Sequence, residues 1–70
     1  MNDAVYLVEE SAYRNTVAVC ATRDLAEKFI EENDGNQLRW LSDGSIIPTY
    51  TIREISKLTL PVLKNVRIIS

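Results

Sequence analysis

The stretch that decides the fold is residues 4–33, AVYLVEESAYRNTVAVCATRDLAEKFIEEN. It contains two runs typical of β-strands, Val5–Glu9 and Thr16–Ala21, followed by the pattern of one short amphipathic helix. A hairpin and a helix can each cover the apolar face of the other. We therefore expect an α+β fold: a small antiparallel sheet in β-β-α-β-β order packed on one amphipathic helix, with room for an additional short strand.

The helix carries signals at both ends. Thr22 can cap its N-terminus, and Gly35 follows its expected C-terminus. Four apolar side chains recur at the helical spacing that buries one face against a sheet. They are Leu25, Ala26, Phe29 and Ile30.

Both β-runs are apolar on both faces, because Tyr6 and Val8 alternate with Val5 and Leu7. A single helix covers only one of those faces. Two interpretations of the second face stay open. Either small residues such as Ala18 are simply exposed, or the second face docks a partner or a second copy of the chain.

The remaining sequence is less regular. Residues 37–41 resemble a short strand, Asp43-Gly44 is a turn signal, and Pro48 interrupts regular structure. A strand is expected over Tyr50–Ser56, with alternate side chains on opposite faces. The tail Val62–Ile69 also has a strand pattern, and we expect it to pair within the monomer or across a dimer.

Length and composition indicate one domain, residues 1–70, in which about 60% of the unfolded surface becomes buried. Such small domains often need an additional staple. The lone Cys20 and the absence of histidine exclude an internal disulfide and common metal sites, so we expect a homodimer. We expect no membrane segment and no secretory signal, because neither pattern occurs.

Several kinds of chemistry have no residues to carry them. The chain has no histidine, and its only two glycines cannot build a phosphate-binding loop. Cys20 lies in the middle of an apolar strand, where a buried inert thiol is expected. We therefore expect no enzyme activity, no metal and no cofactor.

Contact with a partner is the remaining class of function. Tyr13 and Arg14 fall at a loop tip, and both residue types are enriched at interface hot spots. A solitary tryptophan next to Leu38 and Leu41 is more often in a core than an exposed anchor, although it is also a candidate contact. The candidate contact residues are Tyr13, Arg14, Arg39, Trp40, Tyr50, Glu31 and Glu32.

Charge is divided between the two halves of the chain. Residues 1–37 carry a net charge of −5 and residues 38–70 a net charge of +3. If the basic residues of the second half share one face, they could contact nucleic-acid phosphates. They are Arg53, Lys57, Lys64 and Arg67. The alternative functions are therefore a small nucleic-acid or nucleotide-binding module and a self-assembling structural protein.

Four segments together resemble small orphan proteins of bacteriophages, which combine a hairpin, a helix and a closing strand. They are Val5–Val8, Val17–Thr22, Ala26–Glu31 and Tyr50–Ile55. The resemblance covers about residues 4–56 and carries over no catalytic or binding residue. It implies a phage-encoded protein in the cytoplasm of a bacterial host. There it would bind a host enzyme or a bacterial defence complex and inhibit it stoichiometrically.

Overall fold

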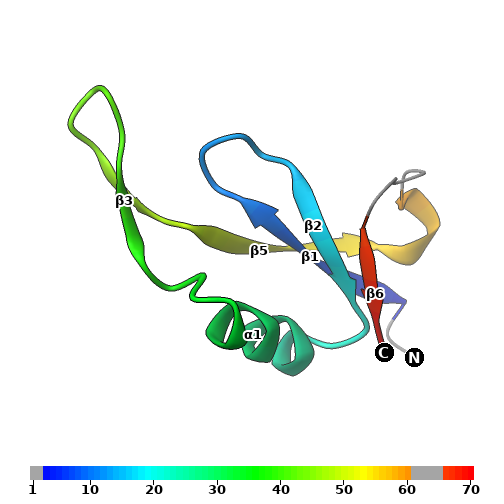
Figure 1. The fold of residues 1–70 in the computed structure, drawn as a ribbon. Coiled ribbons are helices and arrows are strands. Elements are labelled where there is room, and N and C mark those ends of the chain that lie inside the picture. Colours follow the sequence, from blue (N-terminus) through cyan, green and yellow to red (C-terminus); the bar gives the residue numbers. More distant parts are fainter. Residues whose placement is uncertain (1–2, 61–65) are drawn as a thin grey trace.

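A computed structural model describes residues 3–60 and 66–70 of the chain (Figure 1). It contains one α-helix, one 3-10 helix and six strands within those residues. In chain order they are β1 (Ala4–Glu10), β2 (Thr16–Cys20), α1 (Arg23–Glu32), β3 (Leu38–Trp40), β4 (Ile46–Pro48), β5 (Tyr50–Ser56), η1 (Lys57–Thr59) and β6 (Arg67–Ile69). The α+β class is confirmed.

The main sheet has four strands in the order β5-β1-β2-β6. Strand β1 is antiparallel to both β2 and β5, whereas β6 is parallel to β2. The prediction of a purely antiparallel sheet is therefore wrong at β6. Strand β5 already runs in the same direction as β2, and the chain crosses from one edge of the sheet to the other before β6.

Strands β3 and β4 lie outside the main sheet and form a separate antiparallel pair. The predicted order of two strands after the helix is therefore not matched, since four strands follow it. The tail pairs with β2 of its own chain over Arg67–Ile69. The earlier part of the expected tail strand, residues 62–65, lies outside the described residues.

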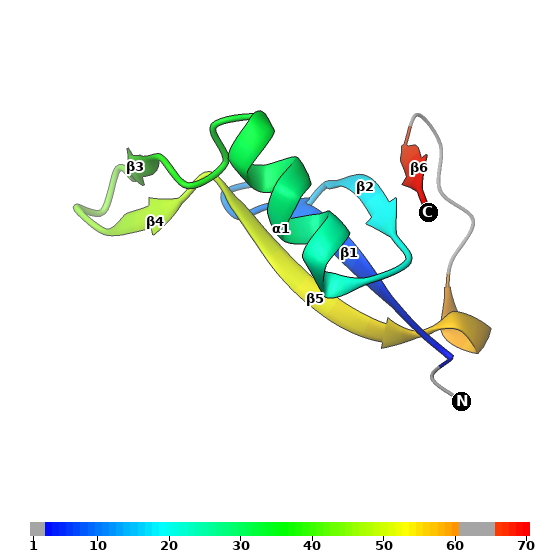
Figure 2. The ribbon, with the colours of Figure 1, turned by 90° about the horizontal axis from the view of Figure 1, so that it is seen from below.

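The core forms between α1 and one face of the sheet (Figure 2). The antiparallel register pairs Tyr6 with Cys20 and Val8 with Ala18, so all four side chains point toward α1. The buried members of this cluster are Tyr6, Val8, Ala18, Cys20, Ala26 and Ile30. Leu25 and Phe29 are half-buried against them, which confirms the predicted helical stripe.

The helix begins as predicted, because the backbone N–H of Leu25 donates to Thr22 Oγ1 at 3.2 Å. Its end differs in detail. Asp34, rather than Gly35, adopts the left-handed conformation, with φ of 55°. A side chain at Gly35 would collide, because an added Cβ would lie 2.8 Å from Cγ2 of Ile30 and still closer to the Tyr50 ring. Glycine is therefore required here by close packing of α1 against β5.

On the second face of the sheet, the central side chains are buried by other residues of the same chain. Leu7 and Val19 are paired across β1 and β2, and they are 1% and 5% exposed. Ala18 is fully buried on the helix face, so the interpretation that it is simply exposed is wrong. Leu7 and Val19 are also unavailable to a partner.

Candidate partner-binding surface

Strands β3 and β4 form a hairpin that extends beyond the Tyr50 end of the sheet (Figure 1). The predicted Asp43-Gly44 turn is confirmed. Gly44 has φ of 89°, which glycine adopts without strain, and Asp43 Oδ1 accepts the backbone N–H of Ser45 at 2.8 Å. Hydrogen bonding from the backbone and side chain of Ser45 lowers the pKa of the Asp43 carboxyl. Pro48 does not disrupt the pair, because it is the last residue of β4.

One side of this hairpin is apolar and open to solvent. The register pairs Leu38 with Pro48 and Trp40 with Ile46, so their four side chains point to the same side. Trp40 is 75% exposed, Leu38 67% and Ile46 47%. We call these four residues the hairpin face.

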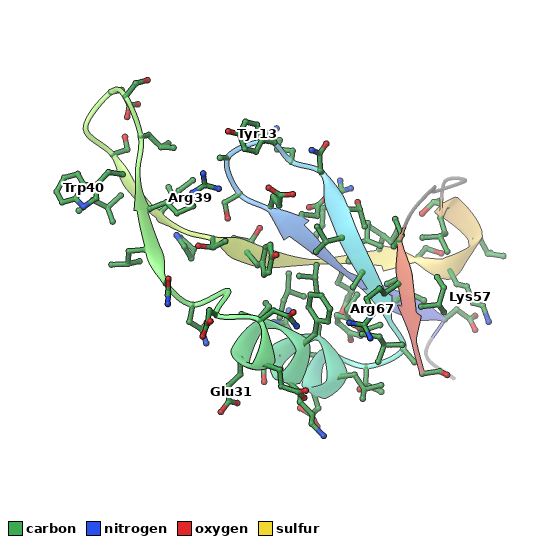
Figure 3. All side chains as sticks on the ribbon, viewed as in Figure 1. Tyr13, Glu31, Arg39, Trp40, Lys57 and Arg67 are labelled. Atoms are coloured by element: carbon green, nitrogen blue, oxygen red, sulfur yellow. The ribbon has the colours of Figure 1, made fainter. Side chains whose placement is uncertain are left out.

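Trp40 does not lie in the core, contrary to the interpretation favoured from the sequence. Its strand belongs to the separate hairpin, so α1 does not cover it. Figure 3 shows the Trp40 side chain directed away from Arg39, which lies on the opposite side of β3. The only tryptophan of the chain is therefore presented at the surface.

The opposite side of the hairpin contacts the loop between β1 and β2. The Arg39 guanidinium lies 5.9 Å from the centre of the Tyr13 ring, a cation–π geometry (Figure 3). At the base of the hairpin, the Thr49 N–H donates to the carbonyl oxygen of Gln37, just before β3. The Thr49 carbonyl oxygen accepts from the N–H of Ser11, at the start of the β1–β2 loop. These contacts hold the hairpin in one orientation relative to the sheet.

The other predicted contact residues lie elsewhere. Arg14 is exposed at the β1–β2 loop, with φ of 57°. Tyr50 is half-buried, and its ring centre lies 6.2 Å from that of Phe29. Glu31 and Glu32 are both exposed on α1, but Glu31 lines a groove next to Tyr50 and Glu32 borders a different depression next to Phe29. The predicted set is therefore distributed over several surfaces.

The basic residues of the second half do not form one strip. Arg53 lies on the second face of the sheet, where it pairs with Glu9 at 3.1 Å. Arg67 lies on the helix face, 6.0 Å from the centre of the Phe29 ring. Lys57 is exposed in η1, and Lys64 lies outside the described residues. Arg53 and Arg67 therefore cannot follow the same nucleic-acid backbone across one face.

Cys20 is fully buried, and burial raises the pKa of its thiol, which disfavours the nucleophilic thiolate. No group of three metal-ligating side chains occurs within residues 3–60 and 66–70. In the same residues, no helix has the length and apolar character to cross a bilayer.

Sequence reasoning missed three members of the hairpin face: Leu38, Ile46 and Pro48. A signal for them was present, because Leu38 and Trp40 alternate before the Asp-Gly turn and Ile46 and Pro48 alternate after it. Such alternation across a turn aligns side chains on one face of a hairpin.

Comparisons with protein-family models, curated proteins and solved structures found no match.

Proposed function

We propose that this protein is a non-enzymatic protein-binding module and that the hairpin face is its principal contact surface. The observation that carries the proposal is the exposure of Trp40, Leu38 and Ile46 together on one side of a hairpin. Contiguous apolar groups at a surface are typical of interaction sites. Tryptophan is also among the residue types most enriched at interface hot spots.

The hairpin is organised before any partner binds. The β3–β4 pairing, the hydrogen-bonded turn and the Arg39–Tyr13 contact all restrict its motion. A preorganised surface loses less conformational entropy on association, so more of the contact energy appears as affinity. The four side chains cover less than the roughly 800 Å² per partner of a standard interface, so a partner would also contact neighbouring surface.

The partner that we propose is a protein of a bacterial host, and the consequence of binding is inhibition of a host enzyme or defence complex. The resemblance to small phage proteins over residues 4–56 supports this part of the proposal. In this setting the protein acts stoichiometrically in the host cytoplasm. A second copy of the chain is the competing occupant of the hairpin face.

Affinity capture from bacterial lysate with three baits tests the proposal. The baits are the wild-type chain, the variant Trp40→Ala/Ile46→Ser and the control Leu58→Ser. Leu58 is a matched control because it is 91% exposed and lies in η1, at the opposite end of the sheet (Figure 1). We expect one host protein at equal stoichiometry on the wild-type and control baits and its loss from the double variant.

Two outcomes would contradict the proposal. Equal capture by all three baits would show that the hairpin face is not the contact surface. If no host protein is retained, sedimentation of the purified chain decides whether a second copy occupies the face. Self-association that disappears in Trp40→Ala/Ile46→Ser would identify that second copy as the partner.

A further inference from the structure

Strand β5 has an open edge. It is the outermost strand of the main sheet, and its other side pairs with β1 along its whole length. Lys57 N–H donates to Asp3 O and Ser11 N–H donates to Thr49 O, just beyond the two ends of β5. Within β5, the odd-numbered residues therefore direct their backbone groups toward β1. In an antiparallel ladder the intervening residues, Ile52 and Glu54, direct theirs away.

These outward groups are free in the part of the chain that the structure describes. Tyr50 donates its N–H to the carbonyl oxygen of Gly35, and Ser56 O accepts from the Thr59 hydroxyl. Between these two residues, the N–H and C=O of both Ile52 and Glu54 have no partner within residues 3–60 and 66–70. Two donors and two acceptors at this spacing match those of an added strand.

A groove lies between α1 and the first half of β5, where Tyr50, Thr51 and Ile52 line it. Its volume is about 560 Å³. Ile30, Tyr50 and Ile52 supply apolar side chains to it. Glu27 and Glu31, one helical turn apart, line it from the α1 side. The groove therefore combines apolar side chains with acidic residues, next to the unpaired backbone groups of Ile52.

Charge distinguishes between the possible occupants. Arg23 also lines the groove, but its guanidinium lies 5.6 Å from the centre of the Tyr6 ring. Neither Glu27 nor Glu31 has an ion-pair partner among the described residues. A second copy adding its own β5 would bring Glu54, which lies on the helix face, toward these carboxylates. Like charges disfavour that arrangement, whereas a basic side chain would complement it.

We propose that the open edge of β5 binds an extended segment of a partner protein, which joins the sheet as a further strand. On the side facing α1, this segment carries apolar residues on either side of a lysine or arginine. The apolar residues pack on Ile30, Tyr50 and Ile52, and the basic residue pairs with Glu27 and Glu31. This site is separate from the hairpin face and does not depend on it.

The probe is a capped heptapeptide, Thr-Val-Thr-Lys-Thr-Val-Thr, titrated into the full-length chain and followed by NMR and calorimetry. We expect saturable binding and slowed hydrogen exchange at the Ile52 and Glu54 amides. Replacing the peptide lysine by glutamate should weaken binding by about tenfold or more, since attraction to both carboxylates becomes repulsion. The variant Glu27→Gln/Glu31→Gln should bind the lysine peptide about three- to tenfold more weakly.

Backbone pairing is tested separately from charge. Two further peptides carry N-methyl groups on alternate residues, one on each of the two alternating sets. Only one set faces β5 in an added strand, so one peptide should lose binding and the other keep it. The variant Glu54→Pro removes an outward N–H without removing a bond to β1 and should also abolish binding.

Trp40→Ala is the matched control, because it alters the hairpin face and leaves the β5 edge intact. It should bind the lysine peptide as the wild-type chain does, whatever the result of the capture experiment. The absence of saturable binding would overturn the inference. Equal affinity for the lysine and glutamate peptides, equal binding of both methylated peptides, or protection at amides far from β5 would each do so as well.

Discussion

Gly35→Ala should destabilise the protein, although alanine is normally the better residue in a folded chain. The φ of Gly35 is not positive, so the backbone itself accepts alanine. Reduced entropy of the unfolded chain would then stabilise by about 0.4–1 kcal/mol. The new methyl group, however, would lie 2.8 Å from Cγ2 of Ile30 and closer still to the Tyr50 ring.

The steric effect should prevail. The Tyr50 ring cannot move away freely, because it packs on the Phe29 ring. The Tyr50 backbone is also held in place, since its N–H donates to the Gly35 carbonyl oxygen at 3.0 Å. Overpacking costs about 1–3 kcal/mol, and contacts as short as those at Gly35 call for the upper part of that range, about 2–3 kcal/mol. After the entropic gain of about 0.4–1 kcal/mol, a net loss of about 1–2.5 kcal/mol remains. For a domain of this size, that corresponds to a fall in melting temperature of about 5–15 °C.

Thermal and urea unfolding followed by circular dichroism measure this change. Gly44→Ala is the control for a glycine substitution without a steric clash, because a Cβ at Gly44 meets nothing within 4 Å. Only the backbone φ of 89° at this position is unfavourable for alanine. A Tyr50→Ala background should reduce the cost of Gly35→Ala, since the closest obstacle is then absent. An unchanged or raised melting temperature in Gly35→Ala would refute the close-packing explanation.

Two further predictions concern single side chains. Trp40 fluorescence should already resemble that of the unfolded chain and be strongly quenched by acrylamide in the native protein, because the ring is 75% exposed; a marked red shift on unfolding would contradict its placement. Burial of Cys20 keeps its thiol neutral in the folded chain above the ordinary pKa of 9.0. The free energy of unfolding should therefore be unaffected by this group below pH 9.0 and fall above it by up to about 1.4 kcal/mol per pH unit. Urea titrations of the wild-type chain and Cys20→Ala measure this part of the pH dependence, which the variant should lack; an equal alkaline loss in both would be evidence against it.

Local patterns were sufficient for the first half of the fold. The helix over Arg23–Glu32 followed from the Thr22 cap and from the spacing of Leu25, Ala26, Phe29 and Ile30, all of which depend on neighbours in sequence. The strand over Tyr50–Ser56 followed in the same way from alternation. The sequence predicts Gly35 as a residue that ends the helix, but the structure requires glycine there because its backbone lies close to the Tyr50 ring. Tyr50 is distant in sequence, so no local pattern indicates this contact.

The candidate contact residues lie on several different surfaces of the molecule. Tyr13, Arg39 and Trp40 do lie on or next to the projecting hairpin. Tyr50 was expected at a contact rim but is half-buried beside Phe29, and Trp40 was weighted toward the core but is exposed. Residue type indicates which side chains can form a contact, whereas exposure depends on whether another element covers them.

The amino-acid sequence by itself determined the α+β class, the hairpin and helix of residues 4–33, and the Asp43-Gly44 turn, because these depend on short-range sterics and hydrogen bonding. Only the tertiary structure decided that β6 crosses to the far edge beside β2, that β3 and β4 leave the sheet, and that β5 keeps an open edge. Which strands become neighbours depends on contacts between residues distant in sequence, and no local pattern specifies them.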